Sequence, residues 1–177
     1  MLGETLVEVL GGLVAEQEAA GVAEGPLGRA VETCPILDQE ALDGLGMVLG
    51  VEPGTVQVLS AQITTPSASP GVTCALRVSD ASAGAVVVGA VPTDQSLEEV
   101  VAELEAADFN LAGEGGADGL PDSEVVLLDS TRFDASRAVW SRPGLAVSVT
   151  GNTDVVADGQ LLTLLASAVE EVQRILR

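Results

Sequence analysis

The chain lacks most of the side chains that enzymes use for chemistry. It has no histidine, lysine or tyrosine, and its seven basic residues are all arginine. This composition excludes Ser-His-Asp and Cys-His mechanisms, lysine Schiff bases, the P-loop lysine and a Cys/His zinc site. Pairs of carboxylates could act as general acid and base, but 27 Asp and Glu residues make chance pairs too common to be informative. We therefore expect a non-enzymatic protein without a cofactor.

Oxygen-bearing side chains gather in one glycine-rich loop, predicted over residues 108–122. The possible ligands in this loop are Asp108, Asn110, Glu114, Asp118 and Asp122. Carboxylate and amide oxygens are ligands that Ca²⁺ accepts, but their spacing does not follow the EF-hand order. We interpret the segment as a solvated acidic loop and predict no metal site.

The only tryptophan, Trp140, lies between Arg137 and Arg142 near a predicted hairpin. Arginine and tryptophan together could bind an anionic ligand or a sugar, with the guanidinium group against the indole ring. The same pattern is also typical of a tryptophan that packs on a sheet while its arginine neighbours stay in solvent. These three residues are the candidate ligand contacts of the sequence.

The two cysteines occupy positions where a disulfide could join a helix to a sheet. Cys34 precedes Pro35, which favours an extended backbone just before a predicted helix. Cys74 alternates with Val72 and Leu76 in a predicted strand, so its side chain should face the core. Two cysteines in an intracellular protein are usually buried thiols, whereas an even number in an exported protein usually forms bridges. We predict a Cys34–Cys74 disulfide.

The pattern of apolar residues predicts the elements that would position these side chains. Helical spacing predicts helices over residues 2–20, 39–49 and 97–107 and from Asp158 onward. Alternation predicts six strands, over residues 55–65, 72–79, 85–91, 124–128, 137–141 and 145–150. Residues 21–32 and 110–123 contain glycine and proline and are predicted to be loops.

The order of these elements predicts an α+β fold. Short connections between successive strands favour antiparallel pairing. We expect a six-stranded, mainly antiparallel sheet covered by helices and built from two consecutive βββα units. Residues 1–22 would be an amphipathic helix joined to a single α+β domain over residues 33–177. The apolar stripe of residues 2–20 should dock on the sheet or on a second copy, which makes a homodimer possible.

A net charge of −20 limits the partners of this protein. Such a surface repels nucleic acid and anionic lipid headgroups, so we expect an unknown protein or small ligand as partner. No apolar run is long enough to predict a transmembrane segment. The first residues lack the positive start of a signal peptide. Either the protein is cytoplasmic or its export signal precedes Met1.

The segment around the cysteines resembles the actinobacterial lipoproteins of the DUF3558 type. The matching positions are Cys34, Ile36, Leu37, Gly50 and Cys74. Leu76 stands where that family has a tryptophan, and the lipobox cysteine of the family is missing from this sequence. The resemblance implies export to the cell envelope, a structural disulfide and no known catalytic residues.

Together these features predict a non-enzymatic, extracytoplasmic binding or interaction domain of a cell-envelope lipoprotein. The alternative is a cytoplasmic acidic adaptor or chaperone-like protein, which would hold its partner through apolar helix faces and negative charge. A carboxylate-dependent hydrolase is a third, more remote alternative.

Overall fold

The computed structural model describes residues 2–25, 28–64, 70–78, 86–114 and 116–177. The helices of this part of the chain are α1 (Leu2–Ala19), α2 (Gln39–Leu49), α3 (Leu97–Ala106), α4 (Asp158–Ile175) and the short 3-10 helix η1 (Asp122–Glu124). Its strands are β1 (Arg29–Val31), β2 (Gln57–Thr64), β3 (Gly71–Arg77), β4 (Val86–Val91), β5 (Asn110–Glu114), β6 (Val125–Ser130), β7 (Ala135–Arg142) and β8 (Leu145–Asn152). The prediction of an α+β fold is therefore confirmed.

All the strands described belong to one antiparallel sheet, in the order β1-β2-β3-β4-β8-β7-β6-β5. The sheet has eight strands, so the prediction of six was wrong. The missing two, β1 and β5, lie at the two edges, within segments predicted to be loops. Because β5 adds a fourth strand between α3 and α4, the element order does not divide into two equal βββα units. Residues 65, 79 and 85, each predicted as the first or last residue of a strand, lie outside the described residues.

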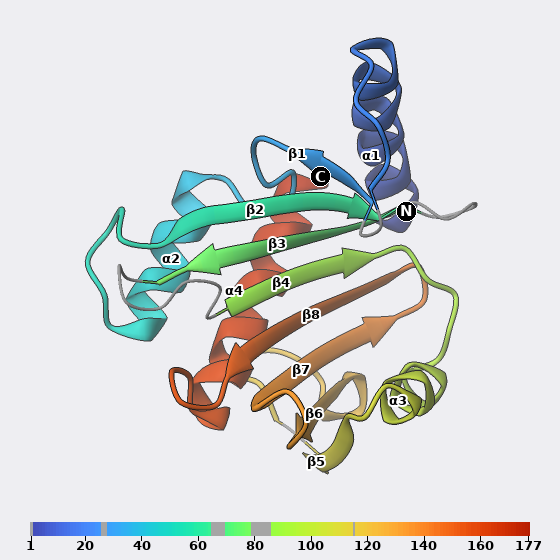
Figure 1. The fold of residues 1–177 in the computed structure, drawn as a ribbon. Helices are drawn as coiled ribbons and strands as arrows, with labels where there is room; N and C mark the ends of the chain where they lie inside the picture. The colour runs from blue at the N-terminus through green and yellow to red at the C-terminus, as the bar shows by residue number, and fades with distance from the viewer. Residues whose placement is uncertain (1, 26–27, 65–69, 79–85, 115) are drawn as a thin grey trace.

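One face of the sheet carries the main hydrophobic core. The row Ala61, Cys74, Val88, Val149 and Ala138 runs side by side across five strands, and all five side chains are buried. Helices α2 and α4 cover this face, and α4 lies behind the sheet in Figure 1. Alternation along each strand places the neighbouring residues on the opposite face.

The opposite face is covered over only part of its width. Helix α3 packs there through Leu97, Val100, Val101 and Leu104, against a second buried cluster of Phe109, Val126, Leu128 and Val139. This cluster belongs to the half of the sheet formed by β5, β6 and β7. No helix in the described ranges lies over the same side of β2, β3, β4 and β8, which faces the viewer in Figure 1. We call this uncovered side of β3, β4 and β8 the open face.

The predicted disulfide between Cys34 and Cys74 is confirmed, with the two Cα atoms 5.8 Å apart. Cys74 is fully buried in the sheet, and Cys34 lies just before α2. The Asp38 carboxylate then caps α2 by accepting a hydrogen bond from the Ala41 amide. Asp38 also accepts one from Arg174 of α4, at 2.7 Å. The bridge and this ion pair tie the start of α2 to both the sheet and α4.

Loss of the disulfide should lower the stability of the fold. The bridge closes a segment with a sequence separation of 40 residues, for which chain entropy gives about 3–4 kcal/mol. Cys74→Ser should lower the free energy of unfolding by at least that amount, because it also leaves a hydroxyl in an apolar layer. Urea denaturation with and without reductant measures the loss. Two titratable thiols in denatured, unreduced protein from an oxidising host would contradict the bridge.

Helix α1 docks on the core of its own chain through its first half. Leu6 and Leu10 are 0% exposed and belong to the main cluster. Gly3 lies against the β7–β8 turn so closely that a Cβ there would come 1.8 Å from the Gly144 carbonyl oxygen. The second half of α1 projects away from the sheet in Figure 1. Gln17 of that half donates to the Ala30 carbonyl of β1, which tethers it.

Truncation of Leu10 tests the docking of α1. Leu10→Ala should cost about 2–5 kcal/mol, because it empties a fully buried site. Val9→Ala is the matched control, because Val9 neighbours it on the same helix but is 39% exposed. Thermal and urea unfolding of the two variants should differ clearly. Equal stability of both variants would mean that α1 contributes little to this core.

Candidate functional site

The open face is a shallow surface of small side chains. The residues that point to this side, all partly exposed, are Thr73, Ala75, Val87, Gly89, Ala146, Ser148 and Thr150. They combine hydroxyl groups with short apolar groups on strands held in register by the sheet. Such a surface can accept a ligand without a large rearrangement of side chains.

Arg137 lies where the open face meets the half of the sheet covered by α3. It belongs to the cross-strand row of Ala75, Val87 and Thr150. Its Nε atom donates a hydrogen bond to Thr150 Oγ1 at 2.8 Å. Its guanidinium carbon lies 4.6 Å from the centre of the Phe109 ring, a cation–π contact. Thr150 and Phe109 therefore hold the head group in one orientation.

No ion pair neutralises Arg137 within the described part of the chain. Burial lowers the pKa of the guanidinium group, but an arginine stays protonated at physiological pH. By contrast, Arg29, Arg132 and Arg174 each pair with a carboxylate. In a chain with a net charge of −20, an arginine that is mostly buried and has no carboxylate partner among the described residues is unusual.

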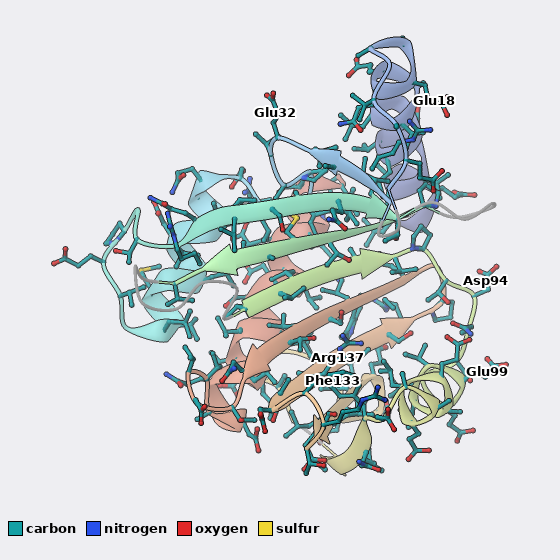
Figure 2. The ribbon with its side chains drawn as sticks, in the orientation of Figure 1. Glu18, Glu32, Asp94, Glu99, Phe133 and Arg137 are labelled. Atoms are coloured by element: carbon teal, nitrogen blue, oxygen red, sulfur yellow. A yellow bond between two sulfur atoms is a disulfide. The ribbon has the colours of Figure 1, made fainter. Side chains whose placement is uncertain are left out.

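Arg137 borders a groove between α3 and the open face, with a cavity volume of about 160 Å³. We call it the α3 groove. Its walls are Gly89 and Val91 of β4, Ala146, Val147 and Ser148 of β8, Val139 of β7, Val100, Glu103 and Leu104 of α3, and the connecting residues Thr93 and Gln95. Figure 2 shows Arg137 on the side of the sheet that faces away from α4. The groove thus has mainly apolar walls and one cationic end.

The segment between β4 and α3 is fixed by hydrogen bonds. Thr93 and Gly144 exchange backbone hydrogen bonds, which anchor this segment to the β7–β8 turn. Gln95 donates from Nε2 to Glu103 Oε1 at 2.6 Å, joining the connection to α3. The rim of the groove is therefore built from residues with defined partners.

Helix α3 begins with a capping box formed by Ser96 and Glu99. The Glu99 amide donates to Ser96 Oγ, and the Ser96 amide donates to the Glu99 carboxylate. The hydrogen bond from that backbone amide is the main reason why the pKa of Glu99 is lowered, followed by the bond from the Ser96 hydroxyl. At the other end, Asp108 adopts a positive φ of 67°. This turn leads into Phe109, whose ring then lies beneath Arg137.

Both phenylalanines of the chain contribute to the support of Arg137. The Phe109 and Phe133 rings stack with centroids 5.9 Å apart. Arg132 lies over the Phe133 ring and pairs with Asp108. Phe109 is thus in contact with both the Phe133 ring and Arg137. The aromatic pair therefore links the β6–β7 turn to the cationic end of the groove.

The three candidate ligand contacts of the sequence do not form one cluster. Trp140 is 1% exposed in the main core, and its Nε1 atom donates to Glu124 at 2.9 Å. The guanidinium carbon of Arg142 lies 5.6 Å from the centre of the Trp140 ring. Arg137 points to the opposite face, because odd and even residues of a strand face opposite sides. Of these three residues, only Arg137 lines the groove. The sequence did not predict the two residues that hold its guanidinium group, Thr150 and Phe109.

The acidic segment predicted as a loop over residues 108–122 is only partly a loop. Residues Asn110–Glu114 form β5, and Asp108 pairs with Arg132. Gly115 lies outside the described residues. Among the described residues, including those of this segment, no three acids or cysteines are grouped as a metal ion would require.

A larger hollow, of about 770 Å³, lies between α1 and the segment around β1. Its polar lining includes the carboxylates Glu8, Glu16 and Glu32 and no arginine. A ligand there would need positive charge or an apolar surface. The α3 groove is smaller but better defined chemically, so we regard it as the candidate site.

Comparison with known proteins gives no relative: no family model, no curated protein and no solved structure matches the chain. None of the helices in the described ranges combines the length and the apolar character needed to cross a membrane.

Removal of the α3 cap should loosen one wall of the groove. Ser96→Ala should cost about 1 kcal/mol of helix stability, which lowers amide-exchange protection in α3 by roughly fivefold. Acid should act in the same direction. Because the pKa of Glu99 is lowered in the folded state, its stabilising effect is present above the unfolded-state pKa and is lost as pH falls through the folded value.

Hydrogen exchange measured by NMR on the wild type and on Ser96→Ala checks both effects. The amides of α4, far from this cap, are the internal control. Unchanged protection of α3 in the variant would show that the cap does not hold this wall.

Proposed function

We propose that this protein is a non-enzymatic binding domain that holds a small ligand in the α3 groove. The observation that carries the proposal is Arg137, a mostly buried cation with no ion pair among the described residues, at the end of a groove with apolar walls. A buried charge without a counter-ion is costly. A bound ligand with a complementary group would offset that cost.

The side chains of the groove favour binding over catalysis. Its hydroxyl groups, Thr93 and Ser148, have no histidine or lysine that could activate them, because the chain contains neither. Glu103 accepts a hydrogen bond from Gln95 at the rim. The groove can therefore orient a ligand, but a general base positioned next to a nucleophile is missing from its described lining.

For the compartment we propose the cell envelope, with the domain as part of an exported lipoprotein of the DUF3558 type. The buried Cys34–Cys74 disulfide supports this proposal, since such bridges persist mainly in oxidising compartments. The short motif around the cysteines is its second support. The cytoplasmic adaptor is less well supported, because a cytoplasmic protein of this composition would usually keep the two thiols reduced.

A fragment screen with a groove-filling control tests the binding function. We expect ligand-observed NMR with a chemically diverse fragment library to yield fragments that bind the wild-type protein. Gly89→Val should abolish this binding, because its side chain would occupy the groove near Ser148. Ser60→Val, an exposed position on β2 outside the groove, is the matched control and should keep the binding. Fragments that bind Gly89→Val as well as the wild type would contradict the proposed site.

A further inference from the structure

We infer that the ligand of the α3 groove carries a single carboxylate on a small apolar body. This inference rests on the proposed binding function and adds the chemical class of the ligand. It follows from the donors that Arg137 leaves free, from the charge around the groove and from the size and polarity of its walls.

The first argument is the geometry of the guanidinium group. An arginine offers five N–H donors in a planar fork. The Nε donor of Arg137 is used by Thr150, and the group packs against the Phe109 ring. Neither terminal Nη nitrogen donates to a described residue, and the residue lines the groove. A planar carboxylate is the group that matches such a fixed pair of donors, through two parallel hydrogen bonds.

The second argument is charge. Arg137 is the only cationic residue in the described lining of the groove, and Glu103 stands at its rim. One guanidinium group neutralises one negative charge. A phosphate monoester or another dianion would keep an excess charge close to Glu103, inside a protein with a net charge of −20. A monoanion is therefore preferred over a dianion, and a cation would meet Arg137 unfavourably.

The third argument is the shape of the site. The apolar lining of the groove includes Val91, Val100, Leu104 and Ala146. The cavity volume of about 160 Å³ is roughly five times the volume of one water molecule in the liquid. It suits a short alkyl chain or a small ring rather than a lipid or a peptide. The hydroxyl groups of Ser148 and Thr93 can form hydrogen bonds with polar substituents of the ligand.

Binding of hexanoate, measured by chemical-shift titration of ¹⁵N-labelled protein, tests the inference. Hexanoate should shift amides of β4, β8 and α3 and the Nε–H signal of Arg137. Hexanamide, which has the same shape without the charge, should bind at least roughly tenfold more weakly, since hydrogen bonds to charged groups are the stronger ones. Inorganic phosphate should cause no comparable shifts. This comparison uses the wild-type protein alone and does not depend on the folding of a variant.

The matched variants are Arg137→Met and Arg77→Met. Arg77 also lies on the uncovered side of the sheet, but it donates to Gln57 of β2 and does not line the groove. Hexanoate should lose at least roughly tenfold in affinity to Arg137→Met and bind Arg77→Met as it binds the wild type.

The possible outcomes separate this inference from the proposed function. Equal binding of hexanoate and hexanamide, or unchanged binding to Arg137→Met, would overturn the carboxylate class. If neutral fragments bind the wild type but not Gly89→Val, the groove remains a binding site while the carboxylate inference fails. If neither fragments nor hexanoate bind, both fail.

Discussion

The alternation of side chains along antiparallel strands is the constraint on which the rest of this structure depends. On β7, Ala138 and Trp140 face the main core, whereas Arg137 and Val139 face the other side. The first set packs with α2 and α4, and the second set meets α3 and the open face. A one-residue shift in the register of β7 would bury the guanidinium group in the core and expose the indole ring. The hydrophobic core and the position of Arg137 are therefore fixed by the same strand pairing.

Local signals in the sequence predicted most of the elements but not the edges of the sheet. Asp38 and Gly50 mark the ends of α2, and the alternation around Cys74 identifies β3. Strand β1 has only three residues and pairs with β2 across the whole of α2, so nothing local indicates it. Strand β5 contains Gly113 and an irregular register next to Leu111, and it opens a glycine-rich segment that resembles a loop. Each of these strands is stabilised by hydrogen bonds to a neighbouring strand, β1 to β2 and β5 to β6, and the local sequence does not indicate that pairing.

The sequence predicted only part of the candidate site. The part that it did not predict consists of tertiary contacts. The sequence indicated Arg137 but grouped it with Trp140 and Arg142. Residues 137 and 140 are an odd number of positions apart on one strand, so their side chains face opposite sides of the sheet. Phe109, which packs against Arg137, comes from the far end of α3, and Thr150 comes from β8. Only the cross-strand register and the turn at Asp108 bring these side chains together. Spacing along the chain contains no signal for such a contact.

In the proposed mode of binding, Arg137 in the groove would attract an anionic ligand, whereas the acidic surface would repel it. Which effect is stronger depends on the distance between the ligand and each charge. Most of the 27 acidic residues act from the surface, where their field is screened over about 8–10 Å at physiological ionic strength. Arg137 acts at contact distance from a mostly buried side chain, where charge interactions are stronger than at the surface. The surface charge would therefore slow the approach of any anion and exclude multiply charged ones, whereas the contact with Arg137 would determine how long a monoanion stays. Selectivity for charge can arise in this way from a single mostly buried arginine in an otherwise negative protein.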